Sequence, residues 1–376
     1  MKARIWHPDG SAGPGCLREV DLPVLEVQES GLVLPNLRVL DVRGGVLFEG
    51  PELCFEHACG GGPLASREAA RQARAFGVVN VAYHLRRGMD YLTLLLGHPL
   101  PSLTAKIGMH ADQRPTWGGA HYRLPAVRYH DLAELEPVAP TGEIHFGPGR
   151  RFVAHGQGRY FHAPAHNAAI IYHELGHHLC RHTADFRLNR RRPLKAQLNR
   201  KVPLDEGTSD YVAAVLLGTP DIFGWHRAGY PRTSQQRRCL DGSWTMSSFW
   251  GQGSAYRRWG EGTDPHIDGT VWSAALWATR MAFVEDGVPG ELFDRLVVQA
   301  LVRLGPAERD MPRLETLGTR RRFSRFLQAL VDADHACGTG CSALILRTFA
   351  QRGILPGYSN EELRDRARQE LVGAAV

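Results

Sequence analysis

The chain has 376 residues, of which 43% are hydrophobic and 22% are charged, and its net charge is +6. This length allows a sizeable core, which we expect to be divided between two lobes. No apolar run is long enough to cross a bilayer, and residues 1–10 lack the apolar stretch typical of a signal peptide. No transmembrane helix is therefore expected.

Strands are expected in the first part of the chain. Over residues 16–56, apolar and polar residues partly alternate, most clearly along 20–27 and 37–42. Pro23 and Pro35 favour edge strands or breaks, because proline cannot donate a ladder hydrogen bond. The glycine-rich run that follows reads as a linker, so residues 1–62 are predicted to form a β-rich segment.

A long helix is predicted next. Ser66 is expected to cap its first turn, and the helix should run to about Leu96 with an interruption near Gly77. Proline- and glycine-rich sequence follows, with one candidate strand at residues 143–146. Residues 147–150 resemble a phosphate-binding loop only superficially, since the required Lys-Ser/Thr pair is missing, and they predict a turn.

Residues His173 to His177 carry the H-E-x-x-H pattern, which is typical of zinc metallopeptidases. Residues four apart on a helix point nearly the same way, so His173 and His177 can hold one tetrahedral metal ion. Glu174 beside them is predicted to accept a proton from a water on the metal. An ordinary helix is the alternative, but the apolar residues 168–172 indicate burial, and buried His and Glu need partners.

The residues after the motif indicate which kind of zinc site to expect. A metzincin would have Gly and His where this chain has Cys180 and Thr183. An aspzincin would have G-T-x-x-D, and residues 207–210 are one residue too short for it. Cys180 is expected to be a buried thiol rather than a ligand.

Glu206 and Asp210 are four apart and would share one face of a second helix. Glu206 can complete a His2Glu zinc site. Asp210 can accept a hydrogen bond from the free ring N–H of His173 and thereby set its tautomer. An acidic first turn that merely complements the helix dipole is the alternative interpretation.

Basic side chains gather between the two motifs. They lack interleaved aromatics, so a solvated insertion is favoured over a nucleic-acid surface, with an anionic substrate contact as a minor option. The cluster consists of Arg187, Arg190, Arg191, Arg192, Lys195, Arg200 and Lys201. Farther on, residues 244–259 predict a packed loop or a wall of a substrate cleft. Apolar residues at helical spacing over 292–304 and 323–331 predict core helices.

The H-E-x-x-H motif followed by Glu206-Gly207-x-Ser209-Asp210 resembles the gluzincin peptidases, and especially the fungalysin family, a relative of thermolysin. Residues 264–273 resemble the fungalysin segment H-x-x-G-E-V-W-A, whose His, here His266, donates a hydrogen bond to the tetrahedral intermediate. Residues 80–84 and 349–354 resemble the N-A-Y-Y-H helix and the closing F-A-x-R-G of the family. Thr270 departs from the pattern, since the family usually has Glu there.

The resemblance implies an α+β, two-lobed, thermolysin-like fold with the active-site cleft between the lobes. Residues 63–204 would form the catalytic lobe with the H-E-x-x-H helix, and residues 205–376 a helical lobe that supplies Glu206, Asp210 and His266. It also implies a zinc metalloendopeptidase with one Zn2+ per chain, a polypeptide substrate and a secreted life. No motif indicates calcium or nucleic-acid binding, and nothing predicts the oligomeric state.

Two alternatives remain at this stage. A zinc-binding protein without peptidase activity would need neither Glu174 nor His266. An aminopeptidase of the same fold would need an acidic anchor for the substrate N-terminus, and no G-x-M-E-N-like motif occurs. The chain has 7 Cys residues, and the Cys54/Cys59 and Cys337/Cys341 pairs are candidates for local disulfides in an oxidising compartment.

Overall fold

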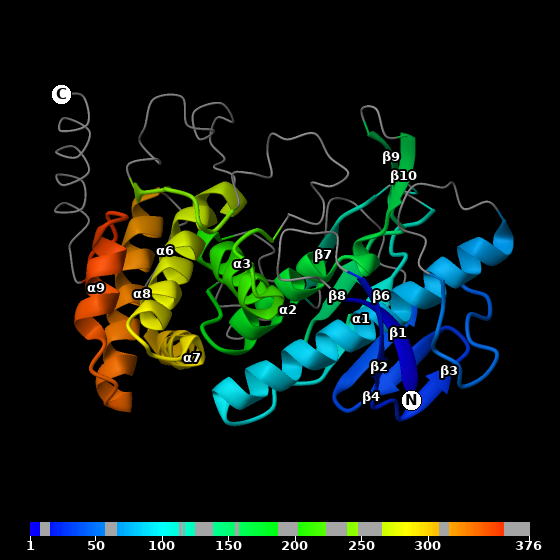
Figure 1. Ribbon diagram of the computed structural model, residues 1–376, viewed down its shortest axis with the longest axis horizontal. Coiled ribbons are helices and arrows are strands. Elements are labelled where there is room, and N and C mark those ends of the chain that lie inside the picture. The colour runs from blue at the N-terminus through cyan, green and yellow to red at the C-terminus, as the bar shows by residue number, and fades with distance from the viewer. Residues whose placement is uncertain are drawn as a thin grey trace.

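The computed structural model combines a mixed β-sheet with long helices, so the chain has an α+β fold (Figure 1). The structure describes residues 1–7, 16–56, 66–112, 115, 117–124, 138–154, 158–186, 202–222, 239–246, 265–307 and 316–356. The basic cluster between the two motifs and most of residues 244–259 lie outside these ranges, as does Cys59.

The main sheet has six strands in the order β3-β4-β5-β6-β8-β7. These are β3 (Glu26–Gln28), β4 (Gly31–Leu34), β5 (Leu37–Asp41), β6 (Leu103–Ile107), β7 (Ala120–Arg123) and β8 (Glu143–Phe146). The β5–β6 and β6–β8 pairs are parallel, and the others are antiparallel. A parallel pair needs a long crossover, which between β5 and β6 contains the helix α1 (Arg67–Leu96). The strands predicted over 37–42 and 143–146 are confirmed.

Two hairpins lie outside this sheet. β1 (Lys2–His7) pairs with β2 (Cys16–Asp21), and β9 (Arg150–Ala154) pairs with β10 (Gly158–His162). The strand predicted over residues 20–27 is only partly correct. It is divided between the end of β2 and the start of β3, and Pro23 lies in the break.

Helix α1 begins as predicted, with Ser66 Oγ accepting a hydrogen bond from the Ala69 amide at 3.1 Å. It ends at Gly97, whose φ of 79° is the left-handed conformation favoured for glycine. The predicted interruption near Gly77 is wrong. A Cβ at Gly77 would lie 3.3 Å from Ala165 Cβ, in the short helix η1 (Pro164–His166). The glycine therefore permits a close crossing of another segment while the helix continues.

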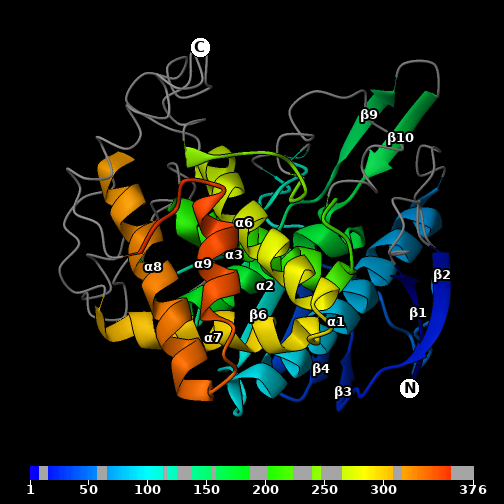
Figure 2. The same cartoon turned by 60° about the vertical axis from the view of Figure 1, so that its left-hand side comes forward.

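The other described helices are α2 (Ala168–His182), α3 (Pro203–Leu217), α6 (Pro265–Glu285), α7 (Gly290–Ala307), α8 (Thr316–Cys337) and α9 (Ser342–Ala350). In Figure 1, α2 and α3 lie between the sheet and the group α6 to α9, and Figure 2 shows α6, α7, α8 and α9 gathered together. The apolar patterns over 292–304 and 323–331 fall on α7 and α8, as predicted.

Trp272 of α6 anchors the core among these helices. Its ring lies 5.2 Å from Phe323 and 4.6 Å from Phe326 of α8, and 5.3 Å from Phe349 of α9, measured between centroids. All four side chains are buried. Aromatic burial of this extent holds α6 in a fixed position against α8 and α9.

Asp294 of α7 ties four helices together. It accepts hydrogen bonds from Tyr91 of α1 at 2.6 Å and from Tyr211 of α3, and it pairs with Arg280 of α6 at 3.1 Å. Burial raises the pKa of the Asp294 carboxyl, and Arg280 together with the two tyrosines offsets part of that cost. The contact joins the helix after the N-terminal strands to the C-terminal helices.

Cys337 and Cys341 are separate thiols, so the predicted disulfide between them is not formed. Their turn is organised instead by Asp334, which accepts hydrogen bonds from the Cys341 amide at 2.9 Å and from the Thr339 and Ser342 hydroxyls. Cys180 is buried on α2, as expected. Within the described ranges, no helix is long and apolar enough to cross a membrane.

Candidate metal centre

Glycines bring α2, α3 and α6 unusually close together. A Cβ at Gly176 of α2 would lie 2.5 Å from Ser209 Cα of α3. A Cβ at Gly207 of α3 would lie 2.3 Å from the Gly269 carbonyl oxygen of α6. Side chains larger than hydrogen would force these helices apart. The three motifs singled out in the sequence are thus adjacent because each carries a glycine at the crossing point.

Four side chains that could bind a metal ion converge where these helices meet. His173 Nε2 and His177 Nε2 are 3.1 Å apart, and they lie 3.2 Å and 3.5 Å from Glu206 Oε2. His266 Nε2 is 3.3 Å from the same oxygen. Two ligands of a tetrahedral zinc ion, each about 2.0–2.1 Å from the metal, are about 3.3 Å apart. The spacing of the His173, His177 and Glu206 atoms therefore fits one metal ion.

The two histidines of the H-E-x-x-H motif are each oriented by a carboxylate of α3. His173 Nδ1 lies 2.8 Å from Asp210 Oδ1, and His177 Nδ1 lies 2.8 Å from Asp205 Oδ1. Ser209 Oγ lies 3.1 Å from the same His177 nitrogen. When each Nδ1–H donates to its carboxylate, both Nε2 lone pairs are directed toward Glu206.

The role of Asp205 was missed by the sequence interpretation, which assigned a carboxylate partner only to His173. The signal was present in the spacing. Asp205 and Ser209 are four apart, as Glu206 and Asp210 are, so the two pairs occupy adjacent faces of α3. One face of that helix meets His173 and the other meets His177.

The centre is buried and acidic. Glu206 and Asp210 are 0% exposed, and Glu174 and Asp205 are 5% exposed. Carboxylates at such depth require compensating positive charge. Burial alone lowers the pKa of the His177 imidazole, but Asp205 and Glu206 outweigh it and raise that pKa to about 10. The pKa of His173 is raised in the same way by Asp210 and Glu206. The cluster thus stabilises a cation, which a divalent metal ion would supply.

Glu174 differs from the other acidic groups of the centre. It precedes Leu175 and Gly176 on α2 and is buried, yet its Oε2 atom has no hydrogen-bond partner among the residues that the structure describes. A buried carboxylate oxygen without a partner is costly and calls for a ligand or water. Glu174 is therefore free to act on a molecule that enters the centre.

His266 occupies the second position of α6 and is half-buried. Its ring stacks against that of His173 with centroids 6.3 Å apart. Its Nε2 is as close to Glu206 as the two imidazoles of α2 are, so the structure places it inside the donor group. This position is compatible with contact to a substrate oxygen and with a fourth ligand. Nearby, burial raises the pKa of Asp268 to about 8.

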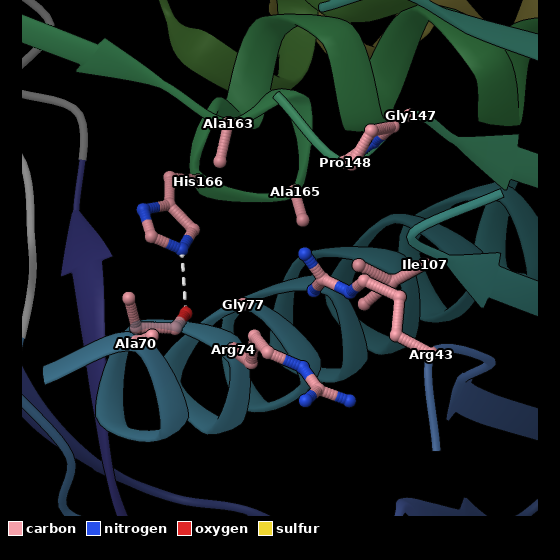
Figure 3. A pocket seen from close by; sticks show the side chains of 11 residues that line it. Arg43, Ala70, Arg74, Gly77, Ile107, Gly147, Pro148, Ala163, Ala165 and His166 are labelled. Carbon is pink, nitrogen blue, oxygen red and sulfur yellow. Dashed lines mark hydrogen bonds between the residues drawn. The ribbon is translucent and has the colours of Figure 1, made fainter. Parts of the chain in front are cut away.

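A cavity of about 90 Å³ lies elsewhere, between α1 and η1 (Figure 3). Its wall includes the side chains of Arg43, Arg74 and His166. Both guanidinium groups pair with Asp41, and His166 Nε2 donates to the Ala73 carbonyl at 2.8 Å. The two arginines of this wall are thus paired with Asp41, and the imidazole is held by a backbone carbonyl. It contains none of the residues that the sequence singled out for catalysis.

The comparisons with known proteins add no identity to this arrangement: no protein-family model matches the chain, and no curated protein matches it significantly. What is established is the presence of His and Glu clusters with the geometry to hold a metal ion.

Proposed function

We propose that the chain is a zinc metalloendopeptidase of the gluzincin type, with a two-lobed, thermolysin-like arrangement of its sheet-containing and helical parts. Two observations carry the proposal: His173, His177 and Glu206 converge, and the neighbouring residue Glu174 has a buried Oε2 atom without a hydrogen-bond partner in the described part of the chain. A metal-binding role alone would account for the three converging side chains. It would not account for the buried Glu174 carboxylate, whose Oε2 has no hydrogen-bond partner among the described residues.

The three converging side chains would hold the zinc ion, and Asp205 and Asp210 would keep the two imidazoles in the tautomer that binds it. Zinc bound there would lower the pKa of a coordinated water to about 7 and polarise the scissile carbonyl. Glu174 then accepts the proton of the attacking water and passes it to the leaving amine. Its burial keeps this carboxylate away from competing bulk water.

His266 is assigned to the substrate oxygen that becomes negatively charged. A donor held at that place acts more strongly in the transition state than in the ground state. One such donor lowers the activation barrier by roughly 3 kcal/mol. The assignment is supported by the half-buried position of His266 at the start of α6, which leaves the ring accessible from outside the centre.

A peptide-library digest tests the proposal. The purified protein is incubated with the library as prepared, after chelation, and after zinc is added back. We expect internal peptide bonds to be cleaved, cleavage to stop on chelation, and activity to return with zinc. His173→Ala should lose both zinc and activity, while the exposed Glu285→Gln on α6 should keep both.

Other outcomes would redirect the assignment. Cleavage confined to the first residue of each peptide would indicate an aminopeptidase. Zinc bound without any cleavage would indicate a zinc-binding protein that lacks peptidase activity. Cleavage that survives removal of all metal would contradict the proposal.

A further inference from the structure

A second histidine cluster lies on the opposite face of the sheet from α2. Side chains alternate between the two faces of a strand. Tyr122 of β7 faces α2, because its hydroxyl lies 3.1 Å from His178 Nδ1. Its neighbour His121 therefore points to the other face, and His121 is directly opposite His145 in the β7–β8 register.

His110 reaches the same place from the loop after β6. His110, His121 and His145 each offer one ring nitrogen to a group whose three atoms lie within 4.8 Å of one another. His121 and His145 are buried, and His110 is half-buried. Its backbone has a φ of 61°, a left-handed conformation that is uncommon for a residue other than glycine. The loop thus takes an unusual conformation where its imidazole joins the other two.

The Trp117 ring packs against two of the three imidazoles. The Trp117 ring lies 5.5 Å from the His110 ring and 5.1 Å from the His121 ring, measured between centroids. The His121 and His145 rings are 5.4 Å apart. Three imidazoles grouped this closely supply the donor set of a three-histidine metal centre.

A carboxylate orients one of these histidines through a contact with its Nε2 atom. His145 Nε2 lies 2.7 Å from Glu143 Oε2. Glu143 is itself fixed by Lys106 Nζ at 3.1 Å and by the Ala139 amide at 2.9 Å. With its proton on Nε2, the His145 ring presents a bare Nδ1 lone pair. That Nδ1 atom is buried and has no hydrogen-bond partner in the described part of the chain.

We propose that His110, His121 and His145 bind a second divalent transition-metal ion, zinc being the one that best suits an all-imidazole set with an open fourth position. The Glu143–His145 pair supplies the carboxylate support that ligating histidines usually have. The ion fastens the loop after β6 to the edge strand β7. It is separate from the proposed catalytic zinc, because the sheet lies between this cluster and α2.

Zinc counting tests the proposal. After dialysis against a weak chelator, the protein is expected to retain about two equivalents of zinc per chain, measured by elemental analysis. His110→Ala and His145→Ala should each retain about one. The exposed His98→Ala is the matched control and should keep the content of the unsubstituted protein. His173→Ala removes the other ion, so failure of either site is distinguishable from failure of the other.

A milder variant guards against loss of folding. Glu143→Gln leaves all three imidazoles in place, and it should weaken binding of one zinc equivalent by 10- to 100-fold. Zinc should also raise the melting temperature of His173→Ala, in which only the second site remains, and should not raise that of His173→Ala combined with His110→Ala. Unchanged zinc content in both His110→Ala and His145→Ala would overturn the proposal.

Discussion

His177 Nδ1 lies 2.8 Å from Asp205 Oδ1, so the second histidine of the H-E-x-x-H motif has its own buried carboxylate partner on α3. His173 has an equivalent partner in Asp210. Both proposed ligands on α2 are therefore oriented by the same neighbouring helix, and α3 also supplies Glu206. The arrangement makes the relative position of α2 and α3 the feature on which the whole centre depends.

The first prediction follows from that contact. Asp205→Asn keeps the size of the side chain and an acceptor oxygen but removes the negative charge that supports His177. Zinc affinity at the centre should fall by 10- to 100-fold, as expected for loss of a supporting carboxylate. A competition titration with a chelator measures it. The exposed Asp286→Asn serves as control, and equal affinities for the two variants would show that Asp205 does not support the site.

A second prediction concerns His266. His266→Ala should lower kcat and kcat/KM together by roughly 10² to 10³, with KM little changed, because the lost contact belongs to the transition state. Zinc content should not change. A fall in zinc content would instead assign His266 as a ligand, which its 3.3 Å distance from Glu206 Oε2 makes geometrically accessible.

A third prediction tests the helix crossing. In Gly207→Ala, the new Cβ would lie 2.3 Å from the Gly269 carbonyl oxygen, so α3 and α6 must separate. We expect the free energy of unfolding to fall by about 1–3 kcal/mol, the usual cost of overpacking, and zinc affinity to fall with it. Gly50→Ala is the control, since a Cβ there has open space around it. Denaturant unfolding of both variants provides the comparison.

The fourth prediction concerns acid stability. Burial lowers the pKa of His84 to about 3 and that of His166 to about 4. Unfolded histidine has a pKa near 6.5, so between about pH 6.5 and these values the unfolded chain binds protons that the folded chain does not. Each group therefore removes stability as the pH falls through this window, by up to about 1.4 kcal/mol per pH unit.

Denaturant unfolding between pH 4 and 6 measures this effect. His84→Gln cannot titrate, so its unfolding free energy should decline less steeply with falling pH than that of the unsubstituted chain. The difference in slope should be about 1.4 kcal/mol per pH unit. Parallel slopes for the two proteins would show that His84 is not held neutral by the fold.

Local patterns predicted the parts of the structure that depend on nearby residues. The capped start of α1 at Ser66 and the strand β8 are examples. Gly77 shows where such patterns fail, because a glycine that ends a helix and one that admits a crossing segment look alike in the sequence. The difference arises from η1, which is distant along the chain and contacts α1 only after folding.

The two candidate metal sites differ in the same respect: one follows from local spacing and the other depends on tertiary structure. His173 and His177 are one helical turn apart, so their shared direction could be read from spacing alone. His110, His121 and His145 have no common period, and only the pairing of β8 with β6 and β7 brings them together. Their proximity depends on the order of the strands in the sheet, which residue spacing in the sequence does not reveal.

The most direct test of the account is kcat/KM of Glu174→Gln at full zinc occupancy, measured on a peptide cleaved by the unsubstituted protein. The substitution preserves shape and leaves the three proposed ligands in place, but it removes the base. The account predicts unchanged zinc content and a fall in kcat/KM by a factor on the order of 10² or more. Equal activity at equal zinc content would contradict the assignment of Glu174 as the general base, and with it the proposed peptidase centre.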